Sequence, residues 1–313
     1  MSFSWSVYSQ CERSKIEEFI KVNEGSFFHE PSFYDYHDKK KFVFLNFICR
    51  TNRKIVAWLP GYKKGKKYVS PAGASYGGPF FSTSIGLEQN LEIINSLRDY
   101  LLKKDFDEVS FTTAPSIYFG DYSFSLSALG FKLSDRIGCH ALQLAGKEWP
   151  SSMNKSKRYL YRKAMNSNLI LSELGSEYYT MFHKMLTDHC RQLKTNPTHN
   201  KNELLMLKKI LPNRVRLFAA MEKNEIKAAV LILVISPRVA YSFYIVSGIS
   251  GNNSGATLVA IMHAIDVLKG EGFHWLDLGP STFKNFSVNK GVSRFKQLLG
   301  SKLYTRDSWT CKL

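Results

Sequence analysis

Apolar residues recur along the first half of the chain with two kinds of spacing. Intervals of three and four residues predict helices over Glu12–Val22 and Leu87–Lys103, each with one buried stripe. Short runs rich in β-branched and aromatic residues predict strands over Phe42–Cys49, Ile55–Leu59 and Glu108–Thr112. Because the polar residues Thr51–Arg53 separate the first two runs, we expect these runs to form a hairpin.

The second half repeats this order of elements. The same patterns predict strands over Asn213–Met221, Ile226–Ile235 and Tyr241–Val246, a helix over Ala256–Lys269, and a short strand over Trp275–Gly279. Each half then closes with a short helix that stops at a glycine, Gly130 in the first and Gly300 in the second. Residue identity between the halves is low, so the pattern predicts a repeated topology and nothing stronger.

The length of 313 residues suits two domains of about 150 residues each. We expect the first domain to span 1–148 and the second 149–313. The second domain opens with a basic helix over Asn154–Asn166 and a helical segment over Glu177–Ile210, interrupted at Asn196-Pro197.

A polar, small-residue loop joins the strand Tyr241–Val246 to the following helix. This loop, Ser250–Gly255, places unpaired backbone N–H groups at a helix start. Such a helix start is a site for phosphate or another anion.

Composition excludes several classes of protein. Hydrophobic content of 44% with 14% aromatic residues is that of a packed globular chain. The longest apolar run, Ala228–Ile235, is far shorter than the ~20 residues of a membrane helix. Met1–Trp5 lacks the basic start of a signal peptide, and the five cysteines show no metal-type spacing. We therefore expect a reduced, cytoplasmic protein without a metal ion.

The net charge of +17 bears on partners rather than on fold. Basic clusters lie at Lys39–Lys41, Lys63–Lys67 and Lys155–Lys163. They favour a phosphorylated or polyanionic ligand or an acidic membrane surface; the alternative for each cluster is a solvated surface that maintains solubility.

The order of hairpin, glycine loop, helix and strand resembles the GNAT acyltransferase fold. Two such units in tandem are similar to the FemAB-like branch of that superfamily. The local matches are Lys155–Ala164, Asp188–Arg191 through Pro197, Ser254–Ala256 and Gly291–Gly300 in the second half, and Tyr68–Gly78 and Ala128–Phe131 in the first. The resemblance implies an α+β protein. It has two tandem GNAT-like units, each a mixed, mainly antiparallel sheet flanked by helices, with a helical insert in the second.

The resemblance also implies N-acyl transfer, in which an activated acyl group passes from a carrier to an amine. GNAT enzymes use acyl-CoA, whereas FemAB-like relatives use aminoacyl-tRNA. The loop that would hold the carrier's pyrophosphate is Asn252, Asn253, Ser254, Gly255, Ala256 and Thr257. It matches the GNAT pattern Gln/Arg-x-x-Gly-x-Gly/Ala only in part, because Asn252 replaces the usual Gln or Arg and Thr257 replaces the usual Gly or Ala.

Two residues are candidates for the chemistry. The resemblance places Lys296, in the Phe-Lys turn, as the cation that stabilises developing negative charge or grips the donor's phosphate. Asp277, at the end of a predicted strand, is a candidate base for the amine proton. The alternatives are a surface lysine for Lys296 and a turn-capping carboxylate for Asp277.

Five residues are candidates for substrate binding. Arg158 and Arg162 lie one helical turn apart and would hold a phosphate through charge-assisted bonds. Tyr76 precedes two glycines that let a backbone approach a ligand closely. Tyr241 and Tyr244 would line the acceptor's site; strand tyrosines also serve as ordinary packing.

Three hypotheses follow. The first is a cytoplasmic N-acyltransferase that uses acyl-CoA to acylate an amine of an amino-sugar or cell-envelope precursor. The second keeps the fold and takes aminoacyl-tRNA as donor, which the +17 charge favours. The third is a non-catalytic tandem GNAT module that binds nucleic acid or a membrane surface. The expected partners are a phosphorylated small molecule or lipid-linked precursor, with tRNA and peripheral membrane contact as alternatives.

Overall fold

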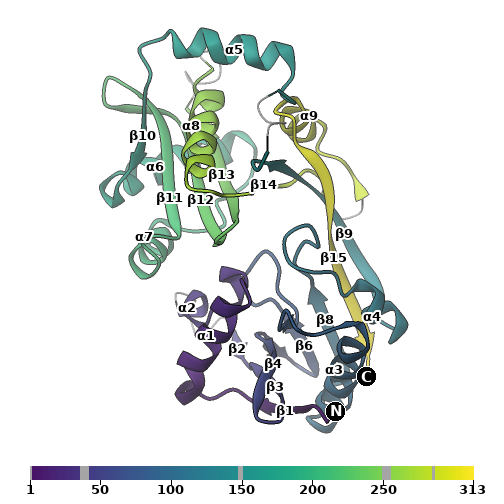
Figure 1. The fold of residues 1–313 in the computed structure, drawn as a ribbon. Helices are drawn as coiled ribbons and strands as arrows, with labels where there is room; N and C mark the ends of the chain where they lie inside the picture. The colour runs from purple at the N-terminus through teal and green to yellow at the C-terminus, as the bar shows by residue number, and fades with distance from the viewer. Residues whose placement is uncertain (1, 36–41, 147–150, 249–254, 284–285) are drawn as a thin grey trace. The chain divides into compact units, whose positions relative to one another are not determined.

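The computed structural model of the chain describes residues 2–35, 42–146, 151–248, 255–283 and 286–313 (Figure 1). They divide into two compact units. Unit 1 comprises Met1–Gly138, Phe283–Ser287 and Tyr304–Leu313, and unit 2 comprises Cys139–Thr282 and Val288–Leu303. The expected boundary between 148 and 149, and the basic run Lys39–Lys41, lie outside the described residues.

The described residues of unit 1 form two sets of paired strands and four α-helices. The first set has the order β1-β3-β4-β7 and consists of β1 (Ser4–Val7), β3 (Phe47–Thr51), β4 (Lys54–Leu59) and β7 (Phe80–Phe81). The second has the order β15-β8-β6-β5-β2 and consists of β15 (Lys302–Lys312, in unit 1 from Tyr304 on), β8 (Glu108–Thr112), β6 (Lys67–Ser70), β5 (Tyr62–Lys64) and β2 (Val43–Phe44). The helices are α1 (Arg13–Val22), α2 (Pro31–Tyr34), α3 (Leu87–Lys103) and α4 (Ser123–Ala128).

Local sequence explains why unit 1 folds in this way. The predicted hairpin forms, since β3 and β4 pair in antiparallel register. Its turn residues Asn52 and Arg53 both have positive φ, which suits the right-handed twist of a hairpin. Helix α3 buries Ile93, Ile94, Leu97 and Leu101, the apolar stripe that the sequence pattern predicts.

Unit 2 is a single sheet covered by helices. Its described strands have the order β10-β11-β12-β13-β14-β9, made of β10 (Ile170–Leu174), β11 (Val215–Glu222), β12 (Glu225–Ser236), β13 (Val239–Ser247), β14 (Trp275–Pro280) and β9 (Lys132–Gln143). Of β9, the residues Cys139–Gln143 belong to unit 2 and the preceding ones to unit 1. Every neighbouring pair is antiparallel except β13 and β14, which run parallel. The helices are α5 (Lys155–Met165), α6 (Tyr179–Gln192), α7 (Lys201–Ile210), α8 (Ala256–Gly270) and α9 (Lys290–Leu298).

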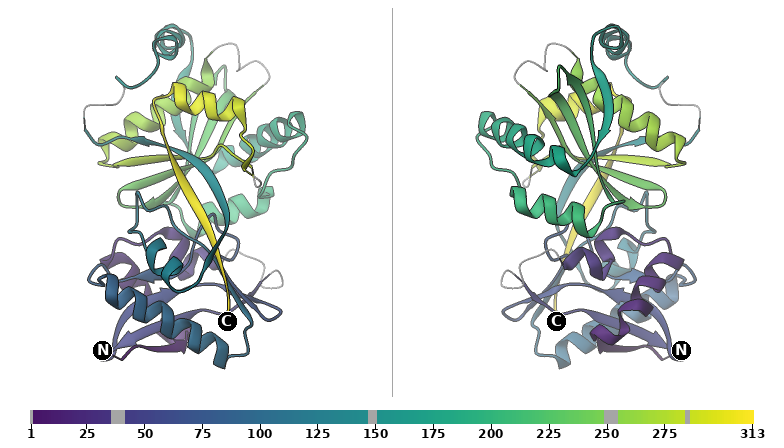
Figure 2. Two further views of the ribbon diagram at one scale, coloured as in Figure 1. Left: turned by 90° about the vertical axis from the view of Figure 1, so that its right-hand side faces the viewer. Right: turned by 90° about the vertical axis from the view of Figure 1, so that its left-hand side faces the viewer.

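Helices on both faces explain the uniformly apolar sequence of the central strands. Helix α8 packs against β11, β12 and β13, and its core includes Ala228, Val230 and Ile232 of β12 (Figures 1 and 2). The intervening residues of β12, such as Leu231 and Leu233, are also buried, and α6 and α7 contact the same strands. A strand buried on both faces lacks polar alternation. None of the helices in the described ranges has the length and apolar run that a bilayer span requires.

Candidate functional site

The parallel pair β13–β14 separates partway along its length. Its register runs from Val239 opposite Trp275 to Tyr241 opposite Asp277 and ends there. Beyond this point β13 remains paired with β12, and β14 remains paired with β9. Beyond Tyr241, the edge of β13 on the side of β14 therefore has backbone N–H and C=O groups that form no ladder hydrogen bonds with β14.

A β-bulge follows at once on β13. Leu231 of β12 lies opposite Tyr244, and the next residue, Ile232, lies opposite Ser242, so Phe243 is the extra residue. A bulge takes one residue out of the ladder and redirects the chain, and bulges are frequent next to active sites. Strand separation and bulge together mark this end of the sheet as the candidate site.

Asp277 and Tyr241 shape the point where the strands part. The buried carboxylate of Asp277 accepts a hydrogen bond from the N–H of Gly279 at 2.6 Å. Gly279 has φ +76°, and a Cβ there would lie 3.2 Å from the ring of Tyr241. The ring therefore packs directly on the glycine. The structure brings these two predicted residues together.

Lys296 lies at the same strand end. Its side chain is buried, and Nζ donates to the carbonyl oxygens of Gly279 at 2.9 Å and Pro280 at 2.6 Å. A buried ammonium needs such partners because it has lost its water. The bonds hold a positive charge at a fixed place and stabilise the end of β14.

His140 is a member of this cluster that the sequence analysis missed. It lies on β9 opposite Gly279, is 1% exposed, and its Nδ1 is 2.7 Å from Oγ of Ser281. Burial, and then the positive charge of Lys296, lower the pKa of the His140 imidazole and so favour its neutral form. Its Nε2 is buried, and no described residue bonds to it. The only signal in the sequence is a lone histidine in the run Cys139-His-Ala-Leu142.

The start of α8 is the second part of the site. Gly255 precedes the helix with φ +75° and supplies no capping side chain. A Cβ at Gly255 would lie 3.0 Å from Cβ of Ala164, so α5 packs closely on this turn. The first N–H groups of a helix lack partners within it, and Oγ1 of Thr257 is buried without a partner in the described chain. These groups are donors for an anion; the predicted loop residues Asn252, Asn253 and Ser254 lie outside the described residues.

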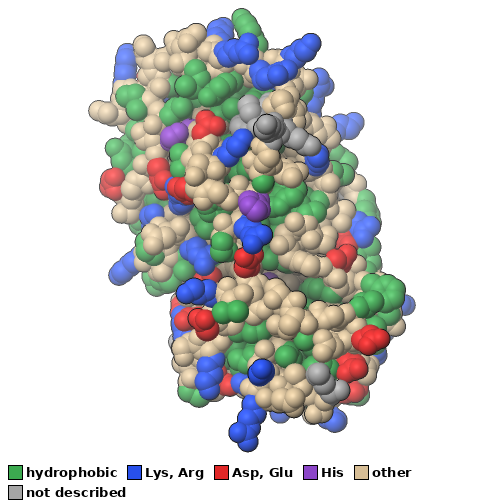
Figure 3. Space-filling model, viewed as in Figure 1, with side chains coloured by type: hydrophobic (Ala, Val, Ile, Leu, Met, Phe, Trp, Pro, Cys, Tyr) green, Lys and Arg blue, Asp and Glu red, His purple; other side chains and the backbone are tan. Residues whose placement is uncertain are grey.

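Arg158 and Arg162 lie on α5, whose Leu160 and Ala164 face α8. Within the described ranges, neither arginine has an ion-pair partner. Figure 3 shows Lys and Arg side chains gathered over α5 at the top of the view. The helix therefore presents positive charge close to the start of α8.

The two remaining predicted tyrosines are engaged in packing. The hydroxyl of Tyr244 accepts a hydrogen bond from the N–H of His199 at 3.2 Å, which ties β13 to the segment between α6 and α7. Burial raises the pKa of the Tyr244 phenol. Tyr76 belongs to unit 1, where it is buried edge-on against Phe28 with ring centroids 4.9 Å apart. Across the described residues, no group of three or more His, Cys, Asp or Glu is arranged to hold a metal ion.

Comparison with known proteins bears on the fold. No protein-family model matches the sequence, and no curated protein matches it. Among solved structures, FemX superposes with a TM-score of 0.73 at 11% identity, covering 100% of this chain and 98% of FemX. A tandem GNAT protein from the clavulanic acid biosynthesis pathway gives 0.55 at 10% identity, covering 99% and 98%. L-PGS from Bacillus licheniformis gives 0.60 at 10% identity, covering 95% and 90%.

These matches and the two units define a tandem GNAT fold of the FemX-like type. The prediction of an α+β protein with mainly antiparallel sheets flanked by helices is confirmed. The segment Glu177–Ile210 contains the helices α6 and α7. That this segment is an insert into the GNAT unit stays a prediction.

Proposed function

We propose that this protein is an N-acyltransferase that moves an acyl group from acyl-CoA to an amine of an amino-sugar or cell-envelope precursor. The observation that carries the proposal is the early end of the β13–β14 ladder beside the bulge at Phe243. In the sequence, the next described helix after β13 is α8, and Gly255 before it supplies no capping side chain. An extended edge followed by an anion site suits a long carrier that ends in phosphates.

Two binding regions support a phosphate-bearing donor. At the start of α8, the N–H groups and the Thr257 hydroxyl are donors for the pyrophosphate of the carrier. The predicted loop residues Asn252–Ser254 immediately precede this turn. Along β13, backbone groups beyond Tyr241 are donors and acceptors for an amide-bearing arm.

The chemistry requires charge stabilisation and a base. Attack of the amine nitrogen on the thioester carbonyl forms a C–N bond and an intermediate with negative charge on oxygen. Backbone N–H groups near the Phe243 bulge and the fixed charge of Lys296 stabilise that oxygen. Collapse breaks the C–S bond and releases the CoA thiolate, while the amine proton passes to Asp277 or to the neutral imidazole of His140.

The positive charge of the chain favours an acceptor that carries a phosphate group. Arg158 and Arg162 would hold a phosphate of the precursor, with Tyr241 and Tyr244 as further contacts. A phosphorylated small molecule or a lipid-linked precursor fits the basic chain, and a lipid-linked one would bring the protein to the membrane surface. We place the reaction in the cytoplasm, where acyl-CoA is available.

A direct test measures thiol release from acetyl-CoA in the presence of glucosamine, galactosamine and their nucleotide-linked forms. We expect Thr257→Val to raise the KM for acetyl-CoA about tenfold with little change in kcat, because it removes one donor to the phosphates. Thr51→Val is the matched control, since Thr51 in unit 1 also has a buried hydroxyl without a partner in the described chain. No thiol release with any amine, together with no binding of acetyl-CoA, would contradict the proposal.

An aminoacyl-tRNA donor is the second candidate. The observation that favours it is the basic helix α5, which offers Lys155, Arg158, Arg162 and Lys163 to a polyanion. Binding of charged tRNA and of acetyl-CoA across a salt series separates the two. Steeply salt-dependent tRNA binding without acetyl-CoA binding supports the second donor, and binding of tRNA without any transfer supports the non-catalytic module.

A further inference from the structure

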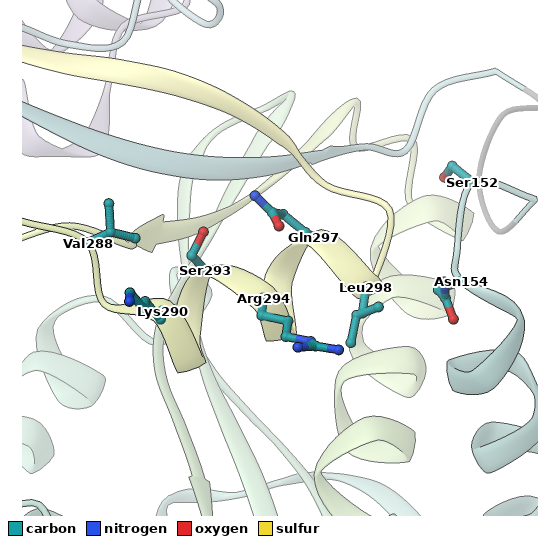
Figure 4. A pocket seen from close by; sticks show the side chains of 8 residues that line it. All are labelled: Ser152, Asn154, Val288, Lys290, Ser293, Arg294, Gln297 and Leu298. Atoms are coloured by element: carbon teal, nitrogen blue, oxygen red, sulfur yellow. The ribbon is translucent and has the colours of Figure 1, made fainter.

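A second concave site lies in unit 2, away from the start of α8. It is a pocket of about 570 Å³ between helix α9 and the segment that leads into α5. Its walls are Ser152, Asn154, Val288, Lys290, Ser293, Arg294, Gln297 and Leu298. Figure 4 shows Ser293 and Arg294 projecting from α9 between Lys290 and Leu298, with Asn154 on the neighbouring segment. The volume falls within the range of about 300–1,000 Å³ that is usual for small-ligand sites.

The electrostatics of this pocket are one-sided. No Asp or Glu occurs in residues 149–172 or 278–306, the two stretches that contain its walls. The first stretch carries the basic residues Lys155, Lys157, Arg158, Arg162 and Lys163, and the second carries Lys284, Lys290, Arg294, Lys296, Lys302 and Arg306. A concave surface lined by one sign of charge concentrates ligands of the opposite sign.

The two cations in the wall, Lys290 and Arg294, have no polar partner among the residues that the structure describes. Lys290 and Arg294 form no ion pair or side-chain hydrogen bond with any described residue. Arg216 in the same unit, by contrast, bonds to both Glu173 and Glu271. Because Lys290 and Arg294 are four residues apart on α9, they lie on one face of the helix. Lys296, on the other side of α9, bonds to the end of β14 and is separate from this pair.

The pocket is built before any ligand arrives. The N–H of Asn154 donates to the carbonyl oxygen of Leu298 at 3.0 Å, which fixes one wall to the other. Gly300 packs so closely that a Cβ there would lie 2.6 Å from Oγ of Ser152. Asn154 also caps the start of α5, whose N-terminal end carries partial positive charge. A site held in place loses little conformational freedom on binding.

We propose that this pocket binds the phosphate or diphosphate group of a small organic ligand. Lys290 and Arg294 pair with the phosphate oxygens, and Ser152, Ser293 and Gln297 supply hydrogen bonds. Val288 and Leu298 contact the organic part of the ligand, for which the volume leaves room. The site does not depend on acyl transfer and remains if the protein has another activity.

Calorimetry of the full chain with inorganic diphosphate tests this proposal at fixed ionic strength. We expect saturable binding with a component that is weakened at least about tenfold in the double variant Lys290→Ala/Arg294→Ala, because charge-assisted bonds to phosphate are strong. Thr257→Val, which changes the start of α8, should leave this component unchanged. Ser293→Trp should weaken the same component without any change of charge, because the indole takes up space between Lys290 and Arg294. The control is Lys184→Ala/Lys209→Ala, which removes two exposed charges of unit 2 from outside the pocket.

Competition then identifies the source of the phosphate. Only the diphosphate whose binding Lys290→Ala/Arg294→Ala weakens reports on this pocket. Its displacement by acetyl-CoA assigns the pocket, in place of the start of α8, to the acyl donor, and its displacement by ADP or UDP but not by acetyl-CoA assigns it to another nucleotide; either result supports the proposal. No binding at millimolar diphosphate, or equal weakening by the control pair, overturns it. Tighter binding of a short RNA that Lys290→Ala/Arg294→Ala abolishes also overturns it, since the occupant is then a polyanion.

Discussion

His29 is a buried ionisable residue in unit 1 that takes no part in the candidate site. Its side chain is 2% exposed, its ring centroid lies 5.2 Å from that of Phe80 with the planes tilted by 32°, and its carbonyl oxygen accepts a hydrogen bond from Nε1 of Trp58. Burial lowers the pKa of the imidazole from the ordinary 6.5 to about 4. The folded protein therefore holds this ring neutral where the unfolded chain protonates it.

The stability of unit 1 should fall as the pH drops from 6.5 toward 4. In this window the unfolded state binds more protons at His29 than the folded state, so acid favours unfolding. The loss at pH 5 relative to pH 7 should be about 2 kcal/mol. We expect His29→Phe, which keeps a buried ring, to remove that part of the pH dependence in urea unfolding. The exposed His274→Gln should retain it, and an unchanged slope in His29→Phe would disprove the assignment.

At the candidate site, sequence could find residues at strand ends but not their partners across the sheet. Tyr241 opens one predicted strand and Asp277 lies near the end of another, and the register places them opposite one another. Lys296 was predicted from the family resemblance alone. Its hydrogen bonds to the carbonyl oxygens of Gly279 and Pro280 give a physical reason for a lysine at this position. His140 was out of reach because it meets Ser281 from 141 positions away, through the pairing of β9 with β14.

Among the elements, the end of β14 is the most constrained. Gly279 combines a positive φ with close contact to the Tyr241 ring, so two separate costs oppose any side chain there. Gly272, after α8, has φ +87° and nothing within 4 Å of a built Cβ. Comparison of Gly272 with Gly279 therefore separates the cost of a side chain at positive φ from the cost of its contact with the Tyr241 ring.

Gly279→Ala should destabilise unit 2 more than Gly272→Ala. We expect about 1 kcal/mol for Gly272→Ala from the backbone alone, and about 2–3 kcal/mol for Gly279→Ala, which must also displace the ring of Tyr241. Thermal unfolding of both variants measures the difference. Adding Tyr241→Leu should recover part of the loss in Gly279→Ala; equal destabilisation by the two alanines would show that the ring contact is unimportant.

Element boundaries followed the sequence where the local pattern was complete. Helix α3 and strand β8 have the predicted bounds, because their apolar spacing is uninterrupted. The long strands β9 and β15 were not predicted. Lys132–Asp135 of β9 is largely exposed and polar, and in β15 only Tyr304, Trp309 and Cys311 are buried. These strands form through tertiary pairing, which single-sequence patterns do not contain.

At the scale of the whole molecule, the chain passes between its two units more than once. After it enters unit 2 at Cys139, it contributes Phe283–Ser287 and Tyr304–Leu313 to unit 1. The repeated topology, predicted from the order of elements, corresponds to a tandem GNAT fold. The C-terminal strand does not follow that simple order, because Tyr304–Leu313 belongs to unit 1 although it follows unit 2 in sequence. In unit 1, β15 pairs with β8 from Ser308 opposite Thr112 to Lys312 opposite Glu108.

Removal of residues 304–313 should therefore unfold unit 1 and spare unit 2. The deletion strips β8 of a hydrogen-bonded neighbour and takes Trp309 and Cys311 out of a core that also contains Val109 and Phe111. Loss of the Trp309 side chain alone costs about 3–5 kcal/mol, a large share of the stability of a domain. Hydrogen exchange should show lost protection in Glu108–Thr112, with protection kept in β11 and β12.

A synthetic peptide of residues 302–313 provides the control, because it can pair with β8 again. Its addition should restore the protection of β8 and α3 in the truncated chain, since it returns both the ladder and the buried indole. If β8 in the truncated chain keeps full protection without the peptide, unit 1 folds on its own residues. The C-terminal strand would then contribute pairing without being required for the fold.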